Sequence, residues 1–304
     1  MKETLTVGNR KIEVSRRDKV FYPETGFTKG DMLAYYQAMA PVLLPHIKGR
    51  AVTLKRYPDG VEGSFFYEKR CPPYAPDWIK TVTMRRKRDN KDIEYCRLDT
   101  QAALIWAANL ANLELHTSLA KATDVSRPAA VVFDLDPGPP ADVTTCARVA
   151  LEIRALLVDL GLESLVKTSG SKGLQLYAPL NTKVTYDQTG RFAHTVAIAL
   201  EQRYPDLIVS RMKKELRGGK VLIDWSQNDD HKTTVAVYSL RARPRPTAST
   251  PVTWEEIETA EEKGDPGLLT FEFNEVLKRV DEHGDLFEAS LKLRQKLPTL
   301  PDEL

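Results

Sequence analysis

The chain has 304 residues, of which 42% are hydrophobic and 28% are charged, a balance typical of a soluble globular protein with a sizeable core. No run approaches eighteen apolar residues, and the short, mixed N-terminus does not resemble a signal peptide, so no membrane association is expected. The three cysteines (Cys71, Cys96 and Cys146) lack paired spacing. This argues against a zinc site or a disulfide framework and predicts a reducing cytoplasmic location.

Charge is unevenly distributed along the chain. The net charge is +2, but residues 251–304 carry 14 acidic and 6 basic side chains, a net charge of −8, so residues 1–250 carry +10. A basic body with an acidic terminal segment favours a polyanionic partner for the body, although charge alone is weak evidence.

The first fifty residues predict a hairpin over 5–14 and a helix that begins after Thr28. Thr28 with Asp31 three residues on resembles a capping box, and Pro45 is expected to close the helix. Lys19 and Lys29 flank the start of this helix, a place suited to holding phosphate. Two solvated lysines are the alternative.

Residues 50–57 predict a strand that carries Lys55, and three aromatic residues at 65–67 follow it beside basic residues. Phe65 and Phe66 next to cations suit base stacking over a charged groove, and they equally suit a core strand. Residues 80–97 are rich in basic side chains and predict an exposed hairpin. A helix over 99–110 leads into a short strand that ends on His116, and a lone histidine is more often structural than functional.

Two carboxylates follow a buried strand at residues 131–138. Asp134 and Asp136 are spaced i and i+2, so they point to the same face of the strand, roughly 7 Å apart. Like charges so placed repel each other unless a cation lies between them, and Mg²⁺ or Mn²⁺ prefers such oxygen ligands. A pair of solvated turn aspartates is the alternative.

The next segments alternate strands and helices, with a helix over 142–160, strands over 165–168 and 174–180, and a helix over 186–203. The small residues of 169–173, with Lys172 among them, let backbone N–H groups and an ammonium approach phosphate oxygens. A glycine-rich hairpin turn is the alternative, and the pattern is not a P-loop.

A second apolar strand, at 221–225, carries Asp224, a plausible third ligand beside Asp134 and Asp136. Three aspartates on adjacent strands would form a two-metal site for phosphoryl or nucleotidyl transfer. Arg241 and Arg243, at i and i+2, are expected to face a triphosphate together. Thr253 with Glu256 predicts a capping box, and an acidic, helical segment follows it.

Taken in order, these segments resemble the polymerase domain of bacterial and archaeal DNA ligase D, a branch of the archaeo-eukaryotic primase superfamily. The resemblance covers about four-fifths of the chain, from about Lys19 to Glu256. The motifs that carry it are DKVFYPETGFTKGD, GSFFYEKRCP, LELH, VVFDLDPGP, KTSGSKGL, VLIDWSQN, KTTVAVYSLRARP and STPVTWEEI.

The resemblance implies a primase-like α/β (α+β) fold with a mixed, largely antiparallel catalytic sheet flanked by helices. We expect residues 1–304 to form a single primase-polymerase domain, with an N-terminal DNA-binding part (1–98), a catalytic core (99–250) and an acidic helical segment (251–304). The implied activity is template-directed nucleotide addition to a DNA primer 3′-OH during non-homologous end joining, with ribonucleotides favoured over deoxyribonucleotides.

The resemblance also assigns site residues. Asp134, Asp136 and Asp224 would hold two Mn²⁺ or Mg²⁺ ions and carry catalysis. The nucleotide-binding residues would be Lys55, Phe65, Phe66, His116, Ser169, Ser171, Lys172, Gly173, Gln175, Arg241 and Arg243. Lys19 and Lys29 would hold the 5′-phosphate of the downstream DNA strand, with Arg16 beside them and Arg217 near the active-site phosphates.

Two residues depart from the family pattern. Gln175 stands where the family usually has histidine, so the grip on the triphosphate or proton delivery is expected to weaken. Arg16 stands where the family often has asparagine, which adds a cation beside the DNA end. The expected partners are gapped or 5′-phosphorylated DNA, NTPs or dNTPs, Ku and a separate DNA ligase, and the expected location is the cytoplasm, in association with the nucleoid. The chain has no room for the ligase or phosphoesterase modules of a full ligase D, so a stand-alone polymerase or an excised domain is expected.

Three other functions remain open. A stand-alone primase-polymerase in replication or base-excision gap repair would share every motif. A haloacid-dehalogenase-like phosphatase also begins with an apolar strand and two aspartates, but it expects threonine or valine where Gly138 stands. A non-catalytic module that binds DNA ends is the third, and the three retained aspartates argue against it.

Overall fold

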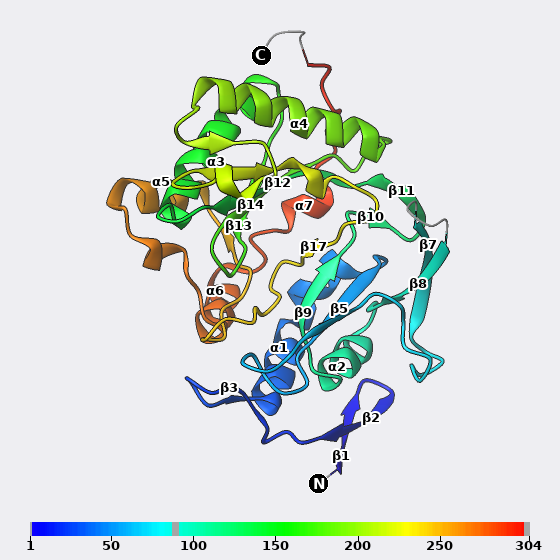
Figure 1. The fold of residues 1–304 in the computed structure, drawn as a ribbon. Helices are drawn as coiled ribbons and strands as arrows, with labels where there is room; N and C mark the ends of the chain where they lie inside the picture. The colour runs from blue at the N-terminus through cyan, green and yellow to red at the C-terminus, as the bar shows by residue number, and fades with distance from the viewer. Residues whose placement is uncertain (1, 87–90, 301–304) are drawn as a thin grey trace. The chain divides into compact units, whose positions relative to one another are not determined.

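The computed structural model describes residues 2–86 and 91–300, and the chain forms two compact units, each built from separate segments (Figure 1). Unit 1 comprises the residues up to Val125 together with Thr233–Ser249 and Phe271–Asp285. Unit 2 comprises Ser126–Lys232, Thr250–Thr270 and the residues from Leu286 onward. The candidate metal ligands belong to unit 2, whereas Lys55, His116 and the two candidate arginines belong to unit 1.

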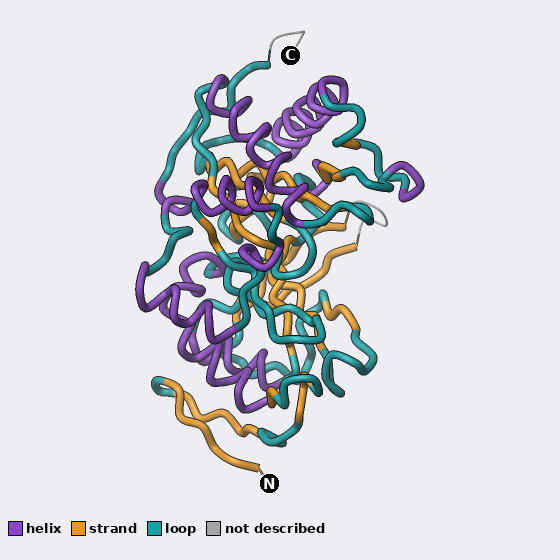
Figure 2. The backbone as a smooth tube through the Cα atoms, turned by 90° about the vertical axis from the view of Figure 1, so that its left-hand side faces the viewer, coloured by secondary structure: helices purple, strands orange, loops and turns teal. Residues whose placement is uncertain are grey.

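Unit 1 combines helices with short, mostly antiparallel strands. Its elements, in chain order, are β1 (Lys2–Val7), β2 (Arg10–Ser15), β3 (Val20–Tyr22), β4 (Phe27–Thr28), α1 (Lys29–Ile47), β5 (Val52–Arg56), β6 (Phe66–Glu68), β7 (Lys80–Arg86), β8 (Lys91–Arg97), α2 (Gln101–Asn109), β9 (Asn112–Thr117), β10 (Ala120–Lys121), β17 (Thr234–Val235) and α6 (Phe273–His283). Strand β11 (Asp124–Pro128) crosses the boundary with unit 2 in sequence. The predicted N-terminal hairpin is confirmed, because β1 and β2 pair antiparallel (Figure 2).

Helix α1 begins where the capping pattern predicted. Thr28 accepts a hydrogen bond from the backbone N–H of Asp31, and the Asp31 side chain accepts one from the backbone N–H of Thr28. The helix runs past Pro45 to Ile47, so the prediction that Pro45 closes it is wrong. Proline removes only one backbone donor, and the buried side chains of Leu43 and Ile47 hold the last turn against the core.

The larger sheet of unit 1 has the strand order β17-β9-β5-β8-β7, with β6 paired to β5. Strands β7 and β8 pair in register from Lys80 opposite Arg97 to Arg86 opposite Lys91, which confirms the predicted hairpin over 80–97. The basic residues Lys87 and Arg88 of this hairpin lie outside the described residues.

The cysteine prediction is wrong in one respect. Cys71 and Cys96 form a disulfide, although 25 residues separate them in sequence. The backbone N–H of Cys71 donates to the carbonyl of Glu94 on β8, and this contact holds Cys71 beside the strand that carries Cys96. Cys146 is a free, buried thiol.

Unit 2 is built around a second sheet, with the strand order β15-β16-β12-β14-β13-β18. Its strands are β12 (Ala130–Pro137), β13 (Leu165–Thr168), β14 (Leu174–Pro179), β15 (Ile208–Val209), β16 (Val221–Asp224) and β18 (Pro251–Val252). Its helices are α3 (Val143–Asp159), α4 (Tyr186–Arg203), η1 (Lys214–Leu216), η2 (Trp225–Gln227), α5 (Trp254–Lys263), η3 (Pro266–Leu269) and α7 (Ala289–Lys292). Apart from the parallel pair β15–β16, neighbouring strands are antiparallel, which confirms the expected mixed, largely antiparallel sheet flanked by helices.

Side chains alternate across β12, and the carboxylates follow the completely buried Val132 on its face of the strand. Val131, Phe133 and Leu135 are completely buried, and α3 and α4 both pack against this strand (Figure 1). Asp134 and Asp136 point to the other face. Beyond the end of β16, the Asn228 side chain completes the edge of β12, because it accepts from the N–H of Val132 (2.9 Å) and donates to its carbonyl (2.7 Å).

Within the described ranges, none of the helices combines the length and the apolar content that crossing a membrane requires.

Candidate two-metal centre

Three carboxylates meet on one face of the unit 2 sheet. Asp134 on β12 lies directly opposite Asp224 on β16 in the antiparallel register, and Asp136 follows Asp134 by two residues on the same face. Each of the three offers a carboxylate oxygen, and these oxygens all lie within 4.8 Å of one another. We call Asp134, Asp136 and Asp224 the carboxylate trio.

Burial and the neighbouring carboxylates act on the pKa of Asp134. The pKa of Asp134 is raised from 3.8 to about 7, first by burial and then by the charges of Asp136 and Asp224. Local donors hold Asp224 in place: its carboxylate accepts from the backbone N–H of Ser226 (3.0 Å) and from the side-chain amide of Gln227 (2.8 Å).

The carboxylate trio fits divalent cations by its chemistry. Its ligand atoms are carboxylate oxygens, which Mg²⁺ and Mn²⁺ prefer, and a cation among them would relieve the repulsion that raises the pKa of Asp134. The number and identity of the ions stay predictions.

A polar row crosses the sheet beside the carboxylate trio. In the strand registers, Gln175 on β14 lies opposite Asp134 and also opposite Lys167 on β13. The Gln175 amide nitrogen donates to Asp134 Oδ1 at 3.1 Å, and the Gln175 carbonyl oxygen accepts from Lys167 Nζ at 2.6 Å. Gln175 therefore holds a metal-ligand candidate in place, and its nucleotide-binding role stays a prediction.

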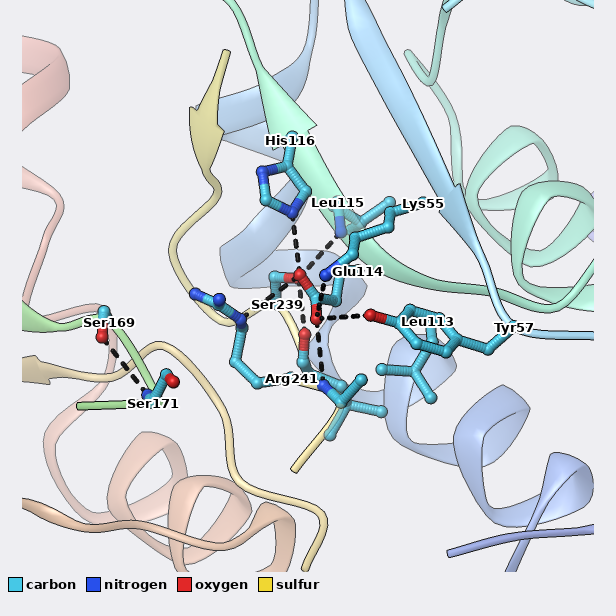
Figure 3. A network of polar contacts seen from close by, with 12 residues as sticks. Lys55, Tyr57, Leu113, Glu114, Leu115, His116, Ser169, Ser171, Ser239 and Arg241 are labelled. Carbon is cyan, nitrogen blue, oxygen red and sulfur yellow. Dashed lines mark hydrogen bonds and ion pairs between the residues drawn. The ribbon is translucent and has the colours of Figure 1, made fainter. Parts of the chain in front are cut away.

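The loop of residues 169–173 is a tight turn between β13 and β14. The Ser169 hydroxyl oxygen accepts from the backbone N–H groups of Ser171 (3.3 Å) and Gly173 (3.2 Å), and Figure 3 draws the first of these bonds. A Cβ on Gly173 would lie 1.8 Å from the carbonyl oxygen of Leu135, so only glycine fits there. Ser171 and Lys172 are exposed at the tip of the loop. The turn and the predicted phosphate contact are therefore compatible.

The backbone of Arg217 lies close to the loop that follows β12. A Cβ on Gly138 would lie 1.9 Å from the carbonyl oxygen of Arg217, so Gly138 is also required by close backbone approach. The Arg217 Nη2 group donates to the carbonyl of Met212 at 2.7 Å. This contact orients the side chain, and its DNA-binding role stays a prediction.

In unit 1, one buried carboxylate gathers several of the predicted nucleotide-binding residues (Figure 3). The Glu114 side chain is 2% exposed, and its Oε1 atom accepts from Lys55 Nζ (3.1 Å), the Tyr57 hydroxyl (3.2 Å) and the backbone N–H of Ala242 (3.1 Å). Its Oε2 atom accepts from His116 Nε2 at 2.9 Å and forms an ion pair with Arg241 Nε at 3.4 Å. We call Glu114 with Lys55, Tyr57, His116 and Arg241 the Glu114 network.

The Glu114 network balances charge inside unit 1. Burial acts to raise the pKa of Glu114, but the hydrogen bond from His116 and the charges of Arg241, His116 and Lys55 hold it well below its usual range. Burial lowers the pKa of His116, and Glu114 opposes that effect. The network therefore keeps a carboxylate ionised beside two permanent cations.

Buried tyrosines hold the backbone that carries Arg241. The Tyr22 hydroxyl donates to the carbonyl of Arg241 (2.8 Å), and the Tyr35 hydroxyl donates to the carbonyl of Tyr238 (2.8 Å). Residues 241–243 are not a strand, because the N–H of Arg243 donates to the carbonyl of Arg241 at 2.9 Å in a tight turn. The strand alternation expected to align the two arginines therefore does not apply here.

The aromatic residues after β5 are exposed, which excludes the core-strand alternative. Phe65 is 51% exposed and Phe66 is 44% exposed. Lys55 Nζ lies 4.7 Å from the centre of the Phe65 ring, and the Phe65 ring stacks on Tyr57 with centroids 5.2 Å apart. A supported, half-exposed ring is available to stack on a base.

The predicted 5′-phosphate residues lie at the start of α1. Lys29 is 6% exposed, and its Nζ atom donates to the Ser15 carbonyl (2.8 Å) and to Asn109 Oδ1 (2.7 Å). Burial, with the charges of Arg16 and Lys19, lowers the pKa of Lys29 to about 8. Lys19 Nζ donates to Asp59 Oδ1 at 2.6 Å. Arg16, Lys19 and Lys29 thus form a cation group whose members feel one another's charge.

Comparison with known proteins decides the family. The family model of the LigD primase-polymerase domain matches residues 28–287. The chain belongs to this family.

Individual relatives support the same family. The chain is 42% identical over 294 residues to the multifunctional non-homologous end joining protein LigD of Mycolicibacterium smegmatis, covering 95% of this chain and 38% of that protein. It is 30% identical over 275 residues to the bifunctional non-homologous end joining protein LigD of Bacillus subtilis, covering 90% of this chain and 43% of that protein. The chain therefore spans about two-fifths of the length of these curated relatives.

A solved structure of the LigD family has the same fold. The polymerase domain from Mycobacterium tuberculosis ligase D in complex with DNA superposes with a TM-score of 0.85 at 40% sequence identity. The match covers 93% of this chain and 99% of that one. The resemblance found in the sequence motifs is confirmed.

Sequence reasoning missed two residues of this LigD-family chain. No role was predicted for Glu114 of the LELH motif. It stands two residues before His116, so strand alternation alone places both side chains on one face. No role was predicted for Lys167, the first residue of the KTSGSKGL motif. Its link to Asp134 depends on the register of three strands, which no local pattern reveals.

Proposed function

We propose that this chain adds nucleotides from NTPs to a DNA primer 3′-OH under the direction of a template, filling gaps or ends in non-homologous end joining. The observation that carries the proposal is the carboxylate trio, gathered in register in a chain of the LigD primase-polymerase family. The names of the relatives support the pathway, and the DNA-bound relative supports a DNA substrate. We propose one functional domain for residues 1–304.

The trio supplies the catalytic groups in this proposal. Asp134, Asp136 and Asp224 would hold two Mn²⁺ or Mg²⁺ ions through their carboxylate oxygens. When bound, the ions lower the pKa of the 3′-OH and stabilise the charge of the reacting phosphate. Gln175 orients Asp134 through its amide N–H group.

Cationic and small residues bind the nucleotide. Four side chains offset the charge of the triphosphate and of the leaving pyrophosphate: His116, Lys172, Arg241 and Arg243. Backbone N–H groups in the 169–173 loop, which contains Ser169, Ser171 and Gly173, accommodate phosphate oxygens. Phe65 and Phe66 stack on bases, with Lys55 near the nucleotide. We propose that ribonucleotides are favoured over deoxyribonucleotides.

The cation group at the start of α1 binds DNA without reading its sequence. Arg16, Lys19 and Lys29 hold the 5′-phosphate of the strand beyond a gap, which positions the duplex. Arg217 contributes a further phosphate contact. We propose that Ku and a DNA ligase act with the chain on DNA ends in the cytoplasm, in association with the nucleoid.

Extension of a gapped, 5′-phosphorylated duplex tests the proposal. Ribo- and deoxynucleoside triphosphates are compared, each with Mn²⁺ and with Mg²⁺, and we expect extension with ribonucleotides favoured and Mn²⁺ supporting it well. Absence of extension under all four conditions would contradict a polymerase. Hydrolysis of a phosphate monoester without extension would favour a phosphatase, and dinucleotide synthesis without a primer would favour a replicative primase-polymerase.

A further inference from the structure

Lys167 is a fully buried ammonium group beside the carboxylate trio. Its relative exposure is 1%, although lysine is almost never fully buried unless it is paired. Nζ of Lys167 donates to Gln175 Oε1 at 2.6 Å and lies 5.7 Å from the centre of the Tyr177 ring. Burying an ammonium is costly unless negative charge compensates it.

The compensating charge lies two strands away in the same row. Lys167, Gln175, Asp134 and Asp224 occupy directly paired positions on β13, β14, β12 and β16, so a single line of side chains crosses the sheet. An ammonium can only donate, and an ionised carboxylate can only accept. The Gln175 amide is therefore oriented with its oxygen toward Lys167 and its nitrogen toward Asp134, which links the two charges by a directed chain of hydrogen bonds.

We propose that Lys167 is the internal counter-cation of the carboxylate trio and that it opposes, by repulsion, the divalent cations that bind there. The inference rests on the metal-binding role given to the trio under the proposed function. Without a bound ion, Lys167 offsets part of the charge that three gathered carboxylates carry. With an ion bound, Lys167 repels it, because both are positive and water cannot surround the buried ammonium to screen it.

The proposal makes Lys167 a residue that tunes metal affinity by its positive charge and does not touch the substrate. Lys232 is the other cation beside the trio in the described part of unit 2, and its Nζ atom lies 3.9 Å from Asp224 Oδ2. The Lys232 side chain is 40% exposed, so solvent weakens its effect and the side chain can move away. Lys167 is buried, so solvent does not screen its charge and its side chain cannot move away.

Binding of Mn²⁺ to Lys167→Met tests the sign of this effect. Methionine keeps the length of the side chain and removes its charge. At pH 8, with Mn²⁺ followed by electron paramagnetic resonance, we expect the dissociation constant to fall on the order of tenfold relative to the parent chain. We also expect a lower melting temperature without metal and a larger rise of the melting temperature on adding Mn²⁺. The surface change Lys183→Met is the matched control and should alter neither quantity.

A charge-restoring double variant makes the test independent of how well Lys167→Met folds. Asp136→Asn removes one exposed carboxylate of the trio, so it should stabilise the metal-free Lys167→Met chain more than it stabilises the parent. If Lys167→Met is unfolded without metal, Mn²⁺ or Asp136→Asn should restore folding. A variant that stays unfolded under both conditions, or whose Mn²⁺ affinity is equal to or weaker than that of the parent, overturns the proposal. Equal Mn²⁺ binding by the parent and by Asp134→Asn/Asp136→Asn would instead overturn the metal site itself.

Discussion

Asp134 on β12 and Asp224 on β16 lie directly opposite each other in an antiparallel pair, ninety positions apart in the chain. Like charges in that position destabilise a sheet, so the pair indicates a functional role and not a contribution to stability. Burial, the charge of Asp136 and, to a smaller extent, the charge of Asp224 raise the pKa of Asp134 to about 7. A divalent cation would turn the repulsion into attraction.

Asp134→Asn should abolish primer extension and leave binding to gapped DNA largely intact. The change removes a carboxylate ligand but keeps the size of the side chain, and we expect a loss of roughly a thousandfold or more in the extension rate. Extension assays and DNA binding by fluorescence anisotropy measure the two effects. Asp187→Asn, on the exposed first turn of α4, is the control. Equal loss of DNA binding would show that Asp134 supports the DNA interface or the fold.

The stability of the metal-free chain should decrease as the pH rises from about 4 to about 7. The pKa of Asp134 is raised on folding, from 3.8 to about 7, so its contribution to the free energy of unfolding is fully present at low pH and is lost across that window. Thermal unfolding in the presence of a chelator measures it. Asp134→Asn should flatten this part of the profile, and an unchanged profile in that variant would contradict the assignment.

Glu114→Gln should destabilise the chain by about 3 kcal/mol, because it leaves buried cations without their shared carboxylate. The pKa of Glu114 is depressed on folding, so its contribution to stability is present above about 4.5 and is lost as the pH falls through the folded-state pKa. Chemical denaturation at pH 7 and pH 4 measures both effects, with exposed Glu62→Gln as the control. An effect no larger than that of the control would show that the network contributes little.

Phe65→Ala and Phe66→Ala should weaken nucleotide or DNA binding without unfolding the chain. Both rings are about half exposed, so little core packing is lost, whereas stacking on a base contributes about 1–3 kcal/mol, or roughly 5- to 150-fold in affinity. Titration with single-stranded DNA and with NTPs separates the two ligands. Val158→Ala, at a residue 59% exposed on α3, is the control. Unchanged affinity for both ligands would exclude the rings from binding.

Lys29→Ala should reduce the preference for a 5′-phosphorylated gap without abolishing extension on an open template. Because the pKa of Lys29 is about 8, the ammonium is charged below that pH and neutral above it, so the preference of the parent chain should decline as the pH rises through 8. Competition between phosphorylated and unphosphorylated gaps measures it. Lys48→Ala, at the other end of α1, is the control. Loss of extension on every template would show that Lys29 is placed wrongly.

Local pattern was sufficient to predict several elements of this chain. The capping boxes at Thr28 and Thr253 each begin a helix, and the predicted helix over 186–203 coincides with α4. The i, i+2 spacing placed Asp134 and Asp136 on one face before any strand order was known. These features depend on hydrogen bonds and side-chain periods within a few residues, so the sequence contains them directly.

The sequence by itself therefore determined many of the elements, the family and the residue types of the candidate site. Only the tertiary structure decided that Asp224 lies opposite Asp134, that Gln175 connects Lys167 to the same carboxylate, and that Cys71 reaches Cys96. The disulfide depends on the contact between the segment of Cys71 and β8. The other two depend on the register of strands distant in sequence, and a shift of one residue would turn the side chains to the other face. Packing of the whole sheet, which no short stretch encodes, sets that register.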